Sequence, residues 1–244
     1  QGELPDGINI PELFRRVQSG CFKGDSLAVI DWVTSEFTGY QLYLLGECGG
    51  CVSQTLASAD RMHLIDGLLM MAFPVLYYPL GTKKAPAVRE FDAKVTVLSY
   101  MRKFYDPKSY LRVLSGRSDW RLFSRSSRVV LAVLLRKCLS KLEVRKFTDG
   151  PDHERFNWEV FSAFKKLIYN KKPILFLLPQ LDNETQEFNT EFMHKVLSKH
   201  EIYEKCCSYA YLPETDHSIM FKPSRELLYR EIINWFNKLD KAAL

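Results

Sequence analysis

Four short apolar segments stand out from the more polar background of this 244-residue chain. They span residues 40–45, 65–73, 173–178 and 206–212, and their lengths are typical of β-strands. The second and third are apolar almost without interruption, which favours parallel strands covered on both faces.

Between and after these segments, apolar residues recur every three or four positions, a spacing that predicts helices. The predicted helices span residues 11–18, 25–37, 49–59, 158–169, 188–199 and 227–239. In the helix 158–169, the spacing places Trp158, Phe161, Lys165 and Ile168 on one face. In the last helix, five apolar residues are expected to face inward: Leu228, Ile232, Trp235, Phe236 and Leu239.

Strands that alternate with helices predict an α/β fold with a mostly parallel sheet. Residues 76–155 differ, because they are basic and aromatic, with helical spacing and no strand candidate. A segment of this length is too long for a simple loop, so we interpret it as a helical cap or lid inserted into the core. The expected organisation is therefore a first core part (1–75), a cap (76–155) and a second core part (156–244).

The first apolar strand ends in the sequence Gly46-Glu47-Cys48-Gly49-Gly50, directly before a predicted helix. A Gly-x-nucleophile-x-Gly sequence between a strand and a helix is typical of a nucleophile elbow, in which the central residue is strained. Small residues are then expected to be required at Gly46 and Gly50. The helix would direct its first N–H groups at the Cys48 thiol and at an oxyanion formed there, with Gly49 as an oxyanion-hole donor.

Two further candidates follow later strands. Asp182 comes after the strand that ends at residue 178, and His217 follows the strand that ends near residue 212. Because functional groups gather at the carboxyl ends of parallel strands, these residues are expected to meet Cys48. Their order along the chain, nucleophile then acid then histidine, is that of the α/β-hydrolase triad. Glu184 lies so close to Asp182 that it remains an alternative for the acid.

In such a triad, the imidazole takes the thiol proton and leaves a nucleophilic thiolate. The carboxylate orients the imidazole and stabilises its cation. Less specific interpretations remain open: Cys48 as an inert buried thiol, His217 as a structural loop residue, and Asp216 as a residue that shapes the loop. Cys48 and Cys51 also form a C-x-x-C sequence, which elsewhere indicates thiol redox chemistry or half of a zinc site.

The chain resembles the α/β-hydrolases associated with exosortase A systems of bacterial exopolysaccharide loci. Their Gly-x-Cys-x-Gly elbow is matched by Gly46, Cys48 and Gly50. Their acid loop is matched by Asp182, Glu187 and Phe188, and their lid by residues 105–117, including Tyr110-Leu-Arg and Leu114-Ser-Gly-Arg117. The resemblance runs from about residue 25 to the end. It implies a sheet of α/β-hydrolase type with a helical cap and a cysteine nucleophile.

Two features depart from that pattern. The chain begins where such a hydrolase has already completed its first strands, so we expect N-terminal strands to be missing or supplied by a second chain. The loop that donates the second oxyanion hydrogen bond is not found. The second departure is Glu47, an acidic residue beside the nucleophile. Its charge is expected to raise the pKa of the Cys48 thiol if the two lie close.

Composition narrows the classes of function. The net charge of +5 is mild, and the basic residues occur as scattered pairs, which argues against a nucleic-acid-binding protein. Six cysteines without a disulfide-like spacing favour a reducing, cytoplasmic location. No apolar run reaches the roughly 20 residues that span a bilayer. No motif calls for a metal ion or an organic cofactor.

Together these features predict a hydrolase that cleaves an ester or thioester through a Cys48–His217–Asp182 triad and a thioester acyl-enzyme. Its partner is expected to be a small acyl substrate, free or bound to a carrier. Two alternatives remain. One is an acyltransferase that uses the same acyl-Cys48 intermediate. The other is a catalytically silent binding module with the same fold. The sequence leaves the natural substrate and the oligomeric state open.

Overall fold

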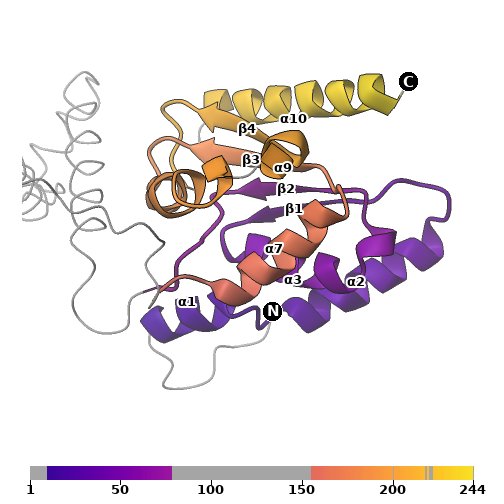
Figure 1. Cartoon of the computed structure of the whole chain (residues 1–244), viewed down its shortest axis with the longest axis horizontal. Helices are drawn as coiled ribbons and strands as arrows, with labels where there is room; N and C mark the ends of the chain where they lie inside the picture. Colours follow the sequence, from indigo (N-terminus) through magenta and orange to yellow (C-terminus); the bar gives the residue numbers. More distant parts are fainter. Residues whose placement is uncertain (1–9, 79–154, 200, 218, 220–221, 244) are drawn as a thin grey trace, which may run out of the picture. The chain divides into compact units, whose positions relative to one another are not determined.

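A computed structural model of the chain describes residues 10–78, 155–199, 201–217, 219 and 222–243 (Figure 1). Its helices and strands, in chain order, are α1 (Ile10–Gln18), α2 (Lys23–Glu36), β1 (Tyr43–Glu47), α3 (Gly49–Asp60), η1 (Met62–Leu64), β2 (Gly67–Met71), α7 (Trp158–Tyr169), β3 (Ile174–Pro179), α8 (Asn183–Glu187), η3 (Phe188–Met193), η4 (Leu197–Lys199), α9 (Glu201–Cys206), β4 (Cys207–Leu212) and α10 (Lys222–Ala243).

The four strands form one sheet in the order β1-β2-β3-β4, and every neighbouring pair is parallel. Tyr43 lies opposite Gly67, Leu68 opposite Ile174, and Ile174 opposite Cys207. All four predicted strands are present, and the mostly parallel α/β class predicted from the sequence is confirmed. The carboxyl ends of the strands therefore point to one edge of the sheet (Figure 1).

Helices cover both faces of the sheet, and successive residues of the central strands alternate between the two cores. In β2, Leu68 and Met70 face the larger core, which contains residues of α3 and α7. Leu69 and Met71 face the smaller core, where Trp235 of α10 is buried. This alternation explains why the central strands are continuously apolar, since each face is covered by helices.

The sequence predicts inward-facing residues for α10 and a set of residues that share one face for α7. For α10 the prediction is confirmed, because its five predicted residues all pack in the smaller core. For α7 the bounds are confirmed. Of the residues expected to share one face, Ile168 is buried, Phe161 packs against the larger core, and Trp158 is 41% exposed. Val160, Phe164 and Leu167 are buried as well.

Two segments after β3 also differ from the prediction. Residues 188–199 were predicted as one helix. They follow the short helix α8 and form instead the short π-helix η3 and the 3₁₀-helix η4. Helix α9 was not predicted, because its six residues carry little apolar periodicity. The aromatic side chains Phe188 and Phe192 of η3 are buried against Phe176 of β3, which fixes this irregular segment to the sheet.

Strand β1 lies at an edge of the sheet, and within the described residues its ladder partner is β2. Leu45 in the middle of this strand is 56% exposed. An exposed apolar side chain on an edge strand is unusual in a finished sheet. The expectation that further strands complete this edge is consistent with the four-stranded sheet and stays a prediction.

The predicted cap, residues 76–155, lies outside the described residues except at its two ends. There the chain leaves and returns side by side. Leu76 pairs with Phe156 in an antiparallel bridge, and the backbone N–H of Tyr77 donates to the carbonyl of Arg155 over 2.7 Å. The guanidinium of Arg155 donates back to the carbonyl of Tyr77 (3.1 Å). The division into core and cap stays a prediction, as does the lid match at residues 105–117.

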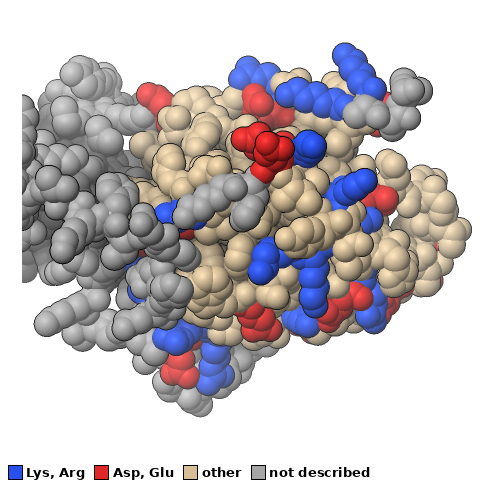
Figure 2. Space-filling model, viewed as in Figure 1, with Lys and Arg blue, Asp and Glu red and all other residues tan. Residues whose placement is uncertain are grey.

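Charged side chains of both signs are interspersed on the face of the molecule shown in Figure 2. This agrees with the scattered basic pairs of the sequence. Within the described ranges, none of the helices has the length and apolar character needed to cross a membrane. The five cysteines in these ranges are free thiols.

Candidate active site

Cys48 lies between β1 and α3 with a backbone φ of 49° and ψ of −119°. A positive φ is uncommon for a residue other than glycine, and such strain costs on the order of 1–3 kcal/mol. The turn is held in place by the backbone N–H of Cys48, which donates to the Met71 carbonyl (2.9 Å). The strained conformation of a nucleophile elbow, expected from the sequence, is thus present at Cys48.

The glycines around Cys48 are constrained to different degrees. A Cβ atom on Gly46 would lie 2.7 Å from the backbone nitrogen of Cys51 and 2.7 Å from the carbonyl carbon of Gly50. Gly46 is therefore required, as predicted. The described residues impose no such requirement at Gly50, because outside its own turn none of their atoms lies within 4 Å of a Cβ atom there. The second constrained position is Gly49, where a Cβ atom would overlap the Val17 side chain of α1.

Gly49 begins α3, so its backbone N–H belongs to the first turn, where N–H groups have no partner within the helix. This places it beside Cys48, where an oxyanion donor was expected. Cys51, in the same turn, is fully buried, and its thiol contacts the carbonyls of Gly46 (3.1 Å) and Met71 (3.2 Å). Burial raises the pKa of Cys51 well above its ordinary value.

The loops after β3 and β4 are tied together by their backbones. The N–H of Gln180 donates to the carbonyl of Leu212 (3.0 Å), and the N–H of Leu181 donates to the carbonyl of Thr215 (2.9 Å). Thr215 is fully buried. These bonds fix the two segments that carry Asp182 and His217 relative to each other.

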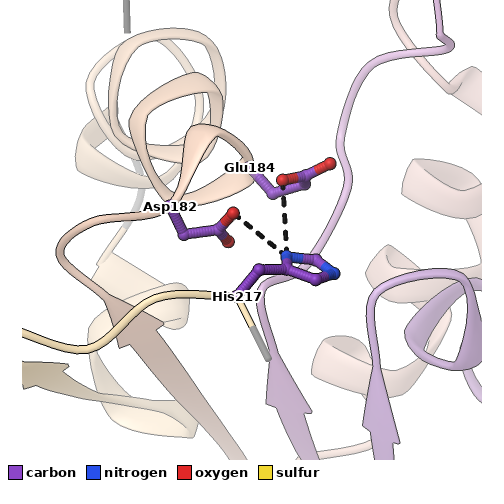
Figure 3. A group of neighbouring side chains, drawn as sticks. All are labelled: Asp182, Glu184 and His217. Atoms are coloured by element: carbon purple, nitrogen blue, oxygen red, sulfur yellow. Dashed lines mark hydrogen bonds and ion pairs between the residues drawn. The ribbon is translucent and has the colours of Figure 1, made fainter. Parts of the chain in front are cut away.

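Asp182 and Glu184 approach the imidazole of His217 from the same side (Figure 3). The distance from Nδ1 to Oδ1 of Asp182 is 3.0 Å, and the distance from Nδ1 to Oε2 of Glu184 is 3.6 Å. A carboxylate only accepts hydrogen bonds, so Nδ1 carries a hydrogen and donates it to Asp182. The side chain of Asp182 is only 3% exposed, and that of His217 is 41% exposed. The other ring nitrogen, Nε2, points away from both carboxyl groups (Figure 3).

The hydrogen bond to Asp182, the interaction with the side chain of Cys48 and the charges of Asp182 and Glu184 together raise the pKa of His217 to about 11, against the opposing effect of burial. The structure therefore joins His217 to Asp182 by a hydrogen bond and places the Cys48 side chain close enough to the imidazole to influence its pKa. The complete Cys48–His217–Asp182 triad stays a prediction. Glu47, the acidic neighbour of Cys48, is exposed.

Glu184 is the residue that the sequence left as an alternative to Asp182 for the acid. Its side chain is 24% exposed. Burial, together with the hydrogen bond and charge of Asp182, raises the pKa of Glu184 to about 8. Of the two candidates, Asp182 is the closer and more buried partner of the imidazole.

Among the described residues, the group with metal-ligand spacing consists of Asp182, Glu184 and His217, whose ligand atoms lie within 4.8 Å of one another. Its imidazole donates to Asp182 through Nδ1, the same nitrogen that would have to bind a metal ion. We therefore interpret the group as an acid–imidazole pair with a neighbouring carboxyl group. The other described histidines, His63 and His194, are exposed.

Sequence reasoning missed the contribution of α1, which approaches the elbow through Val17. Asn157 anchors this helix by donating from Nδ2 to the carbonyl of Gln18 (2.7 Å). Asn157 also caps α7 by accepting from the N–H of Val160 (3.2 Å). An asparagine directly before a helical pattern is a recognisable N-cap signal, so the cap could have been found from the sequence. The contact with Gln18, 139 residues away along the chain, could not.

No protein-family model and no curated protein matches the chain. Several solved structures resemble it at low identity. The peroxisomal α/β-hydrolase Lpx1 of Saccharomyces cerevisiae is 11% identical with a TM-score of 0.44, over 91% of this chain and 60% of the yeast chain. VinJ is 14% identical with a TM-score of 0.41, over 95% and 77% of the two chains.

The thioesterase domain from the curacin biosynthetic pathway is 13% identical with a TM-score of 0.38, over 82% of this chain and 69% of the domain. Likenesses at this level do not establish a family. The fold class rests on the parallel sheet, and the interpretation of the site rests on the geometry around Cys48.

Proposed function

We propose that this protein is a cysteine-dependent hydrolase of α/β-hydrolase type that cleaves an ester or thioester of a small acyl substrate. Cys48 acts as the nucleophile, His217 as the acid and base, and Asp182 as the carboxylate that orients the imidazole. The observation that carries the proposal is the 3.0 Å hydrogen bond between His217 and Asp182, beside a strained turn whose Cys48 side chain contributes to raising the pKa of the imidazole. Its components come from three separate strand ends.

The raised pKa of His217 determines the resting state of the proposed site. With this pKa at about 11, the imidazole is a cation at neutral pH. Its Nε2–H then donates to Cys48 and stabilises a thiolate, which is the nucleophilic form of cysteine. The N-terminus of α3 favours the same negative charge.

In the acylation step, the Cys48 sulfur attacks the carbonyl carbon of the substrate, and the carbonyl oxygen becomes an oxyanion. The N–H of Gly49 is proposed to donate to that oxyanion. When the intermediate collapses, the bond from the carbonyl carbon to the alkoxide or thiolate leaving group breaks. His217 gives the leaving group its proton, which leaves a thioester on Cys48 and a neutral imidazole.

In the deacylation step, the neutral imidazole takes a proton from water, and the resulting hydroxide attacks the thioester. The acid product leaves, and Cys48 returns as a thiolate beside the imidazolium. Acylation favours this step, because an acylated sulfur no longer provides the hydrogen bond that helps to raise the pKa of His217. Asp182 remains ionised throughout and does not accept the proton.

The buried state of Cys51 argues against the alternative redox function of the C-x-x-C sequence. Redox-active cysteines react as thiolates, and burial raises the pKa of Cys51 well above its ordinary value. Its thiol instead contacts the carbonyls of Gly46 and Met71 at the base of the elbow.

The test is hydrolysis of p-nitrophenyl esters and acyl thioesters of increasing chain length by the wild type and by Cys48→Ala, with Cys51→Ala as the matched control. We expect Cys48→Ala to lose at least about 100-fold in kcat/KM, and Cys51→Ala to retain most of it. Full hydrolysis by Cys48→Ala would refute the proposal. A burst of leaving group that turns over only after an acceptor alcohol or amine is added would identify an acyltransferase instead.

A further inference from the structure

The imidazole of His217 faces two carboxyl groups, although a triad requires only one. Asp182 and Glu184 both lie at Nδ1, at 3.0 Å and 3.6 Å, and they approach it from neighbouring positions of one segment (Figure 3). Asp182 is extended directly before α8, and Glu184 is the second residue of that helix. This change of backbone conformation turns two residues that are two positions apart toward the same nitrogen.

Two carboxylates this close, in a largely buried site, do not both ionise easily. The structure reflects this conflict. Oδ2 of Asp182 is buried, and no group of the described residues forms a hydrogen bond with it. A proton on Glu184 resolves the conflict, since it removes one negative charge and allows a hydrogen bond between the two carboxyl groups. That hydrogen bond contributes to raising the pKa of Glu184 to about 8.

We propose that Asp182 and Glu184 act as one carboxyl pair behind His217, in which Glu184 is a positioning residue that holds the Asp182 carboxylate and can replace it as the anionic partner of the imidazole. The pair shares one proton at neutral pH: Asp182 is anionic and Glu184 is neutral. The inference rests on the proposed function, because it assigns a further role around the same Cys48–His217 pair.

The consequence is a specific pattern of variants. In Asp182→Asn, the charge that opposes ionisation of Glu184 is gone, so Glu184 loses its proton and provides a carboxylate close to Nδ1. In Glu184→Gln, the amide still donates a hydrogen bond to Asp182 and stays neutral, so Asp182 continues to serve. The double variant has no carboxylate at Nδ1. Each single change is therefore tolerated in part, and the two together are not.

The experiment measures the second-order rate of Cys48 alkylation by iodoacetamide from pH 5 to 9, by mass spectrometry of the peptide that contains Cys48. It compares the wild type, Asp182→Asn, Glu184→Gln and the double variant. The exposed thiol of Cys21 is the internal reference. Glu226→Gln, on the exposed side of α10 with a 3.6 Å ion pair to Lys222, is the matched control. Circular dichroism and urea unfolding verify that each variant is folded.

We expect the double variant to lose at least about tenfold more rate than the product of the two single effects, which corresponds to a coupling of about 1.4 kcal/mol. The Asp182→Asn profile should also show a fall at acidic pH, as Glu184 takes up its proton, and the double variant should lack this step. A merely structural role of Glu184 does not produce such a step. If the effects multiply to within about twofold, or if the step is missing, the carboxyl pair is refuted.

The alkylation rate reports the thiol and requires no substrate turnover. Coupled carboxyl groups in a protein that hydrolyses no ester or thioester would refute the proposed function and leave the carboxyl pair standing. A reactive Cys48 with esterase activity and independent carboxyl groups would support the proposed function and refute the carboxyl pair. A Cys48 that reacts no faster than Cys21 in the wild type would overturn both.

Discussion

The most informative single perturbation is the change Gly46→Ala, because the structure assigns opposite consequences to two glycines of the same turn. A Cβ atom at Gly46 would lie 2.7 Å from two backbone atoms, those of Cys51 and Gly50, and 2.8 Å from the side chain of Gln54. Backbone atoms cannot move aside as the end of a side chain can, so β1 and α3 would have to separate. At Gly50, a Cβ atom meets no atom of the described part of the chain within 4 Å, apart from the backbone of its own turn.

The expected magnitudes follow from these contacts. Forcing an extra methyl group into a well-packed site typically costs about 1–3 kcal/mol, and Gly46→Ala should lower the free energy of unfolding by this amount or more. Gly50 lies in the first turn of α3. There, replacement of glycine by alanine reduces the entropy lost on folding, and we expect a gain of up to about 1 kcal/mol. In a chain of this size, each 1 kcal/mol shifts Tm by about 2–4 °C.

The assay is urea unfolding monitored by circular dichroism, together with alkylation of Cys48 in the same preparations. Gly46→Ala should lower the unfolding midpoint and slow the alkylation, because the strained turn that presents the sulfur is disturbed. Gly50→Ala should leave the midpoint unchanged or raise it. Equal midpoints for Gly46→Ala and the wild type, or a loss at Gly50→Ala as large as that at Gly46→Ala, would refute the described geometry of the elbow.

Three further predictions concern the surroundings of the site. Gly49→Ala should lower the free energy of unfolding by about 1–3 kcal/mol, because the new methyl group overlaps Val17. Adding Val17→Ala should restore part of this stability in urea unfolding, and no recovery would contradict the contact. Arg155→Met leaves the half-buried Glu187 without its 3.3 Å ion pair and should lower the free energy of unfolding by about 1–3 kcal/mol. Glu187→Gln in the same chain should recover part of this loss. The pKa of Glu184 rises from about 4.5 to about 8 on folding. Between these values the folded state holds a proton that the unfolded state has lost, so the free energy of unfolding falls as pH rises. Thermal unfolding measured from pH 5 to 8 should show a smaller fall in stability for Glu184→Gln than for the wild type.

The elbow could be predicted from the sequence because its determinants are local. A strand, a glycine, a cysteine and a helix follow one another directly, and Gly46 is required by atoms within eight residues of it. The same local reasoning failed at Gly50, because the motif states which positions are usually small and gives no information on the space around each. The real constraint at Gly49 comes from α1, about 30 residues earlier along the chain, and only the folded structure shows it.

Asp182 and His217 could be predicted because parallel strands deliver the residues after their carboxyl ends to one edge of the sheet. The backbone bonds between Gln180 and Leu212, and between Leu181 and Thr215, realise that expectation. The role of Glu184 could not be inferred from the sequence, which offered the two acids as alternatives. Their simultaneous approach to Nδ1 depends on the extended backbone of Asp182 directly before α8.

The central claim is that the Cys48 sulfur, paired with the His217 imidazole, forms a covalent acyl-enzyme. Its most direct test is an acid quench of the protein milliseconds to seconds after mixing with an acyl thioester, followed by peptide mass spectrometry. The account predicts one acyl group on the peptide that contains Cys48 in the wild type, formed at least about 100-fold more slowly in His217→Ala. Acylation of another residue, or equally fast acylation of Cys48 without the imidazole, would contradict it.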